Sequence, residues 1–305
     1  MKIKKALKKM NHHVIFLSEL LLTNFGNLLI PNHRKKITNP IARYVKYPLS
    51  DIKRYMIRNF IIQSKRRKEI RNLILKYCTR PNKNIRFIVN YAIDISRVRY
   101  KKNNVAFCFG IYDDIAFEQN LAKNFDFEIH CFDPTPKSID YMRNLDNKFN
   151  LKFYPKALWT HDCRKKFFFL ESDTTAEDMS GSLLKDHAEA ENFLEVECCT
   201  LDTFKKQLAV ANVDLLKMDI EGAAFEVLVN LNDESPNSLP EQITTEIEIP
   251  LYDEKRMGKE NSFESFIERL NVFFDSISQN YKIYYIPRTK RYNHLEILMV
   301  KDIQN

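Results

Sequence analysis

Residues 213–231, VDLLKMDIEGAAFEVLVNL, indicate the fold class, because they place an apolar strand directly before an acidic turn and an apolar helix. Asp219 stands where the strand ends. Apolar residues recur behind it at helical spacing: Ala224, Val227, Leu228 and Leu231. A strand, a turn and a helix in this order are typical of a parallel sheet that is covered by helices.

The same order occurs twice nearer the N-terminus. The run NVAFCFG, residues 104–110, ends at a glycine and precedes a helical pattern over residues 111–125. The run EIHCFD, residues 128–133, ends in Asp133 and precedes PTPKSIDYMRNL, where prolines favour a helix start. These two segments predict the first two strands of the sheet and their helices.

Four further apolar runs complete the predicted sheet, around a helix over residues 263–274: residues 151–158, 242–249, 281–287 and 295–300. The runs RKKFFFL and LEVECCT predict an inserted antiparallel pair between the third strand and residues 213–231. We therefore expect an α/β fold with a Rossmann-like, seven-stranded, mostly parallel sheet, in which the last two strands form an antiparallel hairpin.

The separation of Gly110 and Asp133 is about the twenty-odd residues that lie between a cofactor-binding turn and a ribose-binding acid in Rossmann-type units. A carboxylate at the end of a second strand can accept hydrogen bonds from both ribose hydroxyls. Surface acids also follow strands by chance, so the spacing leaves both interpretations of Asp133 open.

Charge divides the chain into two parts. Residues 1–102 carry 26 basic and 4 acidic side chains, and residues 103–305 carry 22 basic and 36 acidic ones. We predict a basic, mostly helical N-terminal region over residues 1–100 and a Rossmann-like domain over residues 101–305.

The basic region contains apolar residues at helical spacing within residues 43–77 and 82–102, which predicts amphipathic helices with cationic outer faces. Such helices form a lid on a domain, lie on an anionic membrane surface or bind nucleic acid, and charge alone does not choose among these roles. Residues 14–30 are apolar but interrupted by Glu19, Asn24 and Asn27, and no small-residue cleavage site follows. We therefore expect neither a secretory signal nor a transmembrane helix there.

Six cysteines are scattered along the chain, and none belongs to a C-x-x-C pair. This pattern excludes the usual zinc and dithiol motifs and fits a reducing compartment, so we expect a cytoplasmic protein.

Four segments resemble the FkbM-like family of class I methyltransferases: FGIYDDIAFEQNL, EIHCFDPTPKSI, SGSLL and, above all, LKMDIEGAAFEVL. The resemblance covers residues 104–300 and implies S-adenosylmethionine as the cofactor, bound across the carboxyl ends of the first strands. It places Gly110, Asp133 and Pro134 in the cofactor site, with Asp133 on the ribose. Relatives commonly have G-x-G in the first turn, whereas this chain has Tyr112 at the second glycine position.

Acidic residues at the predicted strand ends are the candidates for the remaining roles. Asp113 or Asp114 can bind the cofactor's amino group, or can serve as a helix cap. Asp219 is a candidate for both cofactor binding and catalysis. Asp219, Glu221 and Glu246 are the candidate catalytic residues, as groups that hold and deprotonate a hydroxyl acceptor. Glu246 and Glu248 lie on one face of a strand, a placement that permits a metal without requiring one, and we predict no metal site.

The resemblance makes O-methylation of a hydroxyl on a sugar or glycan precursor the leading hypothesis, with a small-molecule or glycan acceptor as partner. The basic region adds the hypothesis of peripheral contact with the anionic inner face of a membrane. Two alternatives stay open: a non-catalytic binding protein whose cofactor turn has decayed at Tyr112, and a nucleic-acid methyltransferase that uses the basic arm. We rank nucleic acid as the less favoured partner, because no base-methylating or nucleic-acid-binding motif is present.

Overall fold

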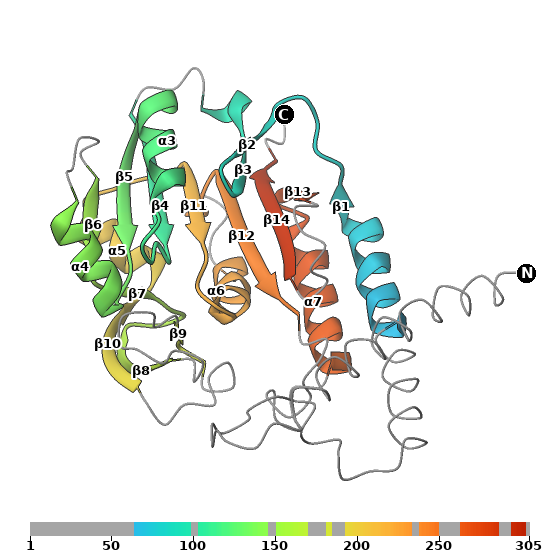
Figure 1. Cartoon of the computed structure of the whole chain (residues 1–305). Helices are drawn as coiled ribbons and strands as arrows, with labels where there is room; N and C mark the ends of the chain where they lie inside the picture. Colours follow the sequence, from blue (N-terminus) through green and yellow to red (C-terminus); the bar gives the residue numbers. More distant parts are fainter. Residues whose placement is uncertain are drawn as a thin grey trace, which may run out of the picture. The chain divides into compact units, whose positions relative to one another are not determined.

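The computed structural model describes eight stretches of the chain: residues 64–98, 103–145, 151–169, 181–184, 193–233, 238–249, 263–286 and 294–302. All of them belong to one compact unit, Asn59–Asn305 (Figure 1). The expectations for residues 14–30 and for the rest of residues 1–63 lie outside the described stretches. Within those stretches, no helix combines the length and the apolar character that crossing a membrane requires.

The centre of the unit is a sheet of eight strands, in the order β1-β13-β14-β12-β11-β4-β5-β6. Its strands along the sequence are β1 (Cys78–Thr79), β4 (Asn104–Phe109), β5 (Phe127–Phe132), β6 (Lys152–Tyr154), β11 (Leu215–Met218), β12 (Gln242–Glu248), β13 (Tyr281–Tyr285) and β14 (His294–Lys301). Only β14 runs antiparallel to its neighbours, β12 and β13. The predicted Rossmann-like sheet with an antiparallel last hairpin is confirmed, and β1 adds an eighth strand at its edge by pairing with β13.

Helices cover both faces of this sheet (Figure 1). On one face lie α3 (Ala116–Phe125) and α4 (Pro136–Asn144), and on the other α5 (Leu201–Gln207), α6 (Ala223–Asn232), α7 (Phe263–Ile277) and the helix of residues 64–77. Alternation along β4 matches this layering, because Ala106 and Cys108 join the core under α3 whereas Phe107 and Phe109 join the core under α5 and α6. Both faces of the sheet are therefore buried, as parallel sheets require.

The prediction of a helix over residues 82–102 is wrong. β2 (Ile85–Ile88) and β3 (Tyr91–Asp94) form an antiparallel hairpin there, followed by a single 3₁₀ turn, Ile95–Arg97. Ile85 and Ile88 are the buried residues of β2, and their separation of three residues imitates a helical repeat. The turn begins at Val89, which has a left-handed backbone (φ 51°) that β-branched residues rarely adopt, so no turn signal was visible.

Residues 64–98 thus belong to the same compact unit as the sheet, whereas the sequence placed a domain boundary at residues 100–101. The predicted amphipathic helix is present over residues 64–77, where Ile70 and Leu73 pack into the core. The buried guanidinium of Arg66 lies 4.8 Å from the ring centroid of Phe263 in α7.

A second sheet of four short strands, in the order β7-β10-β8-β9, lies beside the carboxyl ends of β5 and β6 (Figure 1). Its strands are β7 (Ala157–Leu158), β8 (Cys163–Phe169), β9 (Gly181–Ser182) and β10 (Phe193–Cys199). The predicted antiparallel excursion is confirmed by the pairing of β8 with β10. Residues 151–158 form two strands instead of one, β6 and β7, which belong to different sheets. Pro155 lies between them and has no N–H to continue a ladder.

Candidate active site

The turn between β4 and α3 brings the backbone close to β11. Gly110 has a left-handed backbone (φ 75°), and a Cβ built there would lie 1.7 Å from the carbonyl oxygen of Asp219. Its N–H donates to the carbonyl of Phe132 (3.0 Å), which ties the turn to β5. Only glycine satisfies both the backbone angle and the close approach.

A buried ion pair supports this turn from inside. Lys217 of β11 donates to the carbonyl oxygen of Gly110 at 2.6 Å, and its Nζ lies 3.8 Å from Oε1 of Glu118. Burial lowers the pKa of Lys217, but the nearby Glu118 and Asp219 carboxylates outweigh it and raise the pKa above its ordinary value. Burial raises the pKa of Glu118. Lys217 therefore remains a cation that holds the turn in place.

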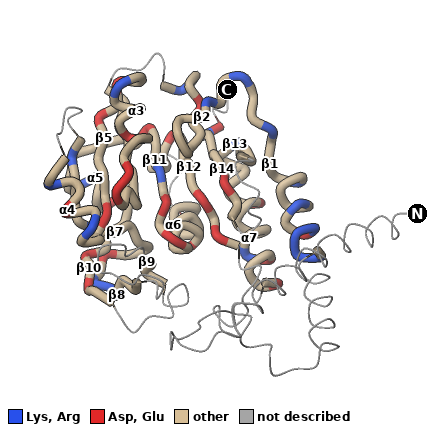
Figure 2. Tube along the Cα trace, in the orientation of Figure 1, with Lys and Arg blue, Asp and Glu red and all other residues tan. Residues whose placement is uncertain are grey.

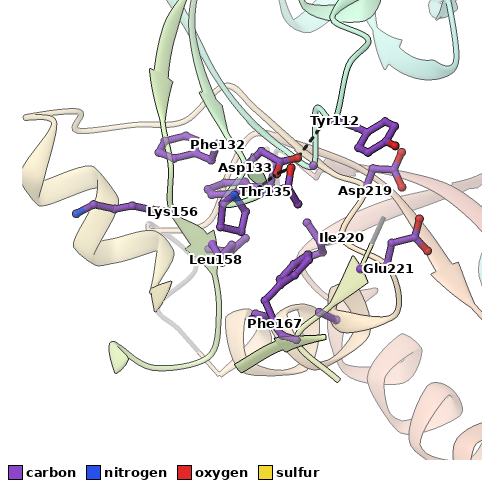
Figure 3. A pocket seen from close by; sticks show the side chains of 17 residues that line it. Tyr112, Phe132, Asp133, Thr135, Lys156, Leu158, Phe167, Asp219, Ile220 and Glu221 are labelled. Atoms are coloured by element: carbon purple, nitrogen blue, oxygen red, sulfur yellow. Dashed lines mark hydrogen bonds between the residues drawn. The ribbon is translucent and has the colours of Figure 1, made fainter. Parts of the chain in front are cut away.

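The Asp133 carboxylate holds the same turn from β5. Oδ2 accepts from the N–H groups of Ile111 (3.1 Å) and Tyr112 (3.0 Å), and Oδ1 accepts from the N–H (2.9 Å) and hydroxyl (2.6 Å) of Thr135 (Figure 3). A carboxylate has about four lone-pair positions, and these four donors occupy them. The structure thus shows that Asp133 braces the turn, and the ribose contact stays a prediction.

Tyr112 also adopts a left-handed backbone (φ 47°). This conformation explains why glycine suits the position in relatives, because a tyrosine there is strained. The ring of Tyr112 lies 4.6 Å from Nζ of Lys137, which also lies 3.1 Å from the carboxylate of Asp113. Asp113 does not line the cavity described below. Asp114 accepts from the first N–H of α3 at 2.9 Å, which supports the capping alternative for this residue.

Asp219 follows β11 and receives a hydrogen bond from an unexpected partner. The hydroxyl of Tyr91, in β3, donates to Oδ2 of Asp219. The Tyr91 ring also lies 5.0 Å from Nζ of Lys217. The hairpin that the sequence misassigned therefore orients the carboxylate at the tip of β11.

Glu221 occupies the turn into α6 in a left-handed conformation (φ 45°), directly before Gly222 (φ 79°). Its carbonyl oxygen accepts from the hydroxyl of Ser182 at 2.5 Å. Ser182 belongs to the SGSLL segment, which thereby supports a strained turn.

The carboxyl group of Glu221 is an unusually weak acid. Burial, a hydrogen bond with Glu248 and the nearby charge of Asp219 raise its pKa from 4.5 to about 8. At neutral pH the two glutamates therefore share a proton, with Glu221 as the protonated partner. This carboxyl pair lies at the carboxyl ends of β11 and β12, the edge where ligands bind in open α/β sheets.

Glu246, the third predicted catalytic residue, lies farther along this edge. Its carboxylate contacts Nδ1 of His294 at the start of β14 and does not line the cavity described below. Burial lowers the pKa of His294, and the charge of Asp219 opposes this shift. Among the described residues, no group of three or more His, Cys, Asp or Glu side chains is arranged to hold a metal ion.

These turns enclose a cavity of about 250 Å³ (Figure 3). Five predicted site residues line it together: Gly110, Asp133, Pro134, Asp219 and Glu221. Its apolar wall is built mainly from Phe109, Phe132, Leu158, Phe167 and Ile220. The cavity therefore combines an apolar wall with a carboxylate edge.

The sequence did not reveal Tyr91, because the assigned helix concealed the hairpin that carries it. Thr135 was also missed, although a threonine two residues after an acid is a recognisable Asx-turn and N-cap signal. Thr135 caps α4 by accepting from the N–H of Ser138.

Comparison with protein-family models matches residues 74–283 to the methyltransferase FkbM domain. The chain belongs to the FkbM methyltransferase family. The match begins thirty residues before the segment that carried the sequence resemblance, and so includes the helix end, β1 and the β2–β3 hairpin. Curated proteins provide no significant match.

Three solved structures resemble this chain at low sequence identity and low TM-score. A fibrillarin pre-rRNA processing protein from Methanococcus jannaschii is 10% identical over 71% of this chain and 81% of its own, with a TM-score of 0.37. A TehB-like SAM-dependent methyltransferase from Corynebacterium glutamicum is 10% identical over 66% and 82%, with a TM-score of 0.32. A precorrin-6y C5,15-methyltransferase from Geobacter metallireducens is 10% identical over 74% and 94%, with a TM-score of 0.33. The FkbM assignment rests on the sequence match, since these similarities are low.

The cofactor of this FkbM methyltransferase is S-adenosylmethionine, and the cavity residues fit it. The aromatic and aliphatic wall suits an adenosyl group, and the Asp219 carboxylate at the cavity would attract a cationic sulfonium. Gly110 has no Cβ, so the turn can lie against the backbone of Asp219. Gly110, Pro134 and Asp219 would hold the cofactor, which supplies a methyl group bound to sulfur.

Proposed function

We propose that this FkbM methyltransferase transfers the methyl group to a hydroxyl of a sugar or glycan precursor. The observation that carries the proposal is the set of carboxyl groups at one sheet edge: Asp219, Glu221, Glu246 and Glu248. Asp219 and Glu221 line the apolar cavity, where a carboxylate can accept a hydrogen bond from a neutral hydroxyl and take the proton of a reacting one.

Methyl transfer requires a new bond from the acceptor oxygen to the methyl carbon while the carbon–sulfur bond breaks, and the hydroxyl proton must leave. Asp219 accepts this proton, because its carboxylate lines the cavity and is oriented by Tyr91. The Glu221–Glu248 pair carries one shared proton, so it can donate one hydrogen bond to the sugar and accept another. These hydrogen bonds orient the sugar. Fixing the acceptor in line with the sulfonium supplies the rest of the acceleration.

Asp219→Asn tests this assignment, with labelled methyl transfer to a panel of simple glycosides as the measurement. The amide keeps the shape but not the basicity, so we expect a rate about 10²–10⁴-fold lower with cofactor affinity largely kept. Tyr91→Phe leaves the carboxylate in place and should lose about tenfold or less, the value of one hydrogen bond.

Glu221→Gln is the matched carboxyl control. If it alone abolished transfer, the base would be Glu221, and Asp219 would orient the acceptor. If both variants transferred methyl at the parent rate, neither carboxyl group would be catalytic.

We also propose that the enzyme works in the cytoplasm, in peripheral contact with the anionic inner face of a membrane. The excess of Lys and Arg in residues 1–102 supports this contact through long-range attraction. Deleting residues 1–35 should weaken binding to anionic vesicles, and added salt should do the same while cofactor binding is unchanged. Vesicle binding that is indifferent to both would contradict the proposal.

A further inference from the structure

A second cavity, of about 880 Å³, lies between the helix of residues 64–77 and the ends of β12, β13 and β14. Ile249 follows the carboxyl end of β12, Tyr285 ends β13, and His294 begins the antiparallel β14. These three positions lie at the same edge of the sheet as Asp219 and Glu221, because β12 runs parallel to β11. We call it the basic cavity.

The described residues that line the basic cavity include four cations and no carboxylate. Arg67, Lys68 and Arg71 come from one face of the helix, and Arg80 follows β1. Figure 2 shows Lys and Arg along this helix and Asp and Glu along β12. A volume of this size is within the range of ligand sites, which is about 300–1,000 Å³.

The same helix contributes apolar side chains to the basic cavity. Ile70, Ile74 and Leu75 line it beside the cations, and Leu75 is 70% exposed although it is a large aliphatic residue. A surface that alternates guanidinium groups with aliphatic side chains matches an amphipathic anion better than a simple inorganic one.

His294 connects the basic cavity with the carboxyl groups of the active site. It lines the basic cavity, its ring contacts Glu246, and it lies near enough to Asp219 for that charge to act on it. An acceptor that enters the basic cavity with its charged group can therefore extend a hydroxyl towards Asp219.

We propose that the basic cavity binds the phosphate ester of the acceptor together with an apolar chain attached to it, and so makes a phosphorylated, chain-bearing sugar the substrate class. This inference rests on the proposed function for the hydroxyl that is methylated, but not for the phosphate contact itself. The planar fork of arginine donates two hydrogen bonds to a carboxylate or to a phosphate. A phosphate ester has more oxygens and more negative charge than a carboxylate, so it matches a site with three arginines better.

Calorimetric titration of the full chain with octyl phosphate tests the proposal without any methyl transfer. Inorganic phosphate has the charge without the chain, and octyl glucoside has the chain without the charge. We expect octyl phosphate to bind more tightly than either.

The double variant Arg71→Gln/Arg80→Gln should lower octyl phosphate affinity at least about tenfold, the effect of lost hydrogen bonds to a charged group. Both arginines are exposed, so the fold should survive, which thermal unfolding checks. Lys65→Gln/Arg86→Gln is the matched control, since it removes two exposed cations outside the basic cavity and should leave the affinity unchanged.

Equal affinities for octyl phosphate and octyl glucoside would overturn the phosphate contact, and equal affinities for octyl phosphate and inorganic phosphate would overturn the apolar half. An equal loss of octyl phosphate affinity in the control variant would show that net charge alone causes the effect, and would also overturn the proposal. Failure of the proposed function is a different result: octyl phosphate still binds, but no hydroxyl acceptor is methylated.

Discussion

The two cavities at the carboxyl edge of the sheet differ in charge and in the elements that build them. The first is lined by turns after β4, β5 and β11 and presents carboxyl groups, whereas the basic cavity is lined by the helix of residues 64–77 and the β12–β14 edge and presents cations. The first is also held by buried contacts such as the pair of Lys217 and Glu118, while most cations of the basic cavity are exposed.

This difference separates two requirements of a methyltransferase. The cofactor site needs fixed backbone turns, because the cofactor must be held in one position for methyl transfer. The proposed acceptor site needs charge and chain length matched to one substrate, and exposed side chains on the helix of residues 64–77 would supply them. Changes in the first cavity should therefore affect stability and cofactor affinity together, and changes in the basic cavity should affect only acceptor affinity.

Gly110→Ala should have the largest effect on the first cavity. A Cβ there would lie 1.7 Å from the carbonyl oxygen of Asp219, and the residue must keep a φ of 75°. We expect a loss of about 2–5 kcal/mol in the free energy of unfolding, from the clash and the left-handed strain together. Urea unfolding measures this loss. Parent-like stability with parent-like cofactor affinity would show that the turn is not held as described.

Glu221→Gln should have a smaller effect that depends on pH. Because burial and Glu248 raise the pKa of Glu221 from 4.5 to about 8, the folded state retains a proton that the unfolded state releases in this range. The parent should thus lose stability as pH rises from about 4.5 to 8, while the variant should not. At pH 8.5 we expect the variant to be more stable than the parent by ~2–5 kcal/mol, since one pKa unit corresponds to about 1.36 kcal/mol.

Urea unfolding of both proteins at pH 6 and pH 8.5 checks this difference. Glutamine imitates the protonated carboxyl group and donates to Glu248, so the two stabilities should approach each other at the lower pH. Parallel pH profiles for parent and variant would mean that Glu221 is ionised at neutral pH.

The parallel half of the fold and most of the first cavity could be predicted from sequence, because their signals are local. Apolar runs that end at Gly110, Asp133 and Asp219 define three strand ends, and parallel strands bring those ends to one edge. The roles of these residues could be predicted less well than their positions. The spacing that singled out Asp133 does not show that its oxygens accept four protein hydrogen bonds.

The antiparallel half could be predicted less well, because its signals depend on distant contacts. Ile85 and Ile88 look helical until β2 pairs with β3, and Tyr91 gains meaning only when its hydroxyl reaches Asp219. The pairing of β1 with β13 joins residues about two hundred positions apart, which no local pattern encodes. These long-range contacts place the helix of residues 64–77 beside the site.

Calorimetric titration with S-adenosylhomocysteine, the product that carries the same adenosyl group, tests the central claim that the first cavity binds the cofactor. The account predicts measurable binding to the parent. It predicts binding weaker by about 1–3 kcal/mol in Asp133→Ala, because the carboxylate braces the turn that follows Gly110. Arg71→Gln/Arg80→Gln should bind as the parent does. Absence of binding to the parent, or unchanged affinity in a folded Asp133→Ala protein, would contradict the account.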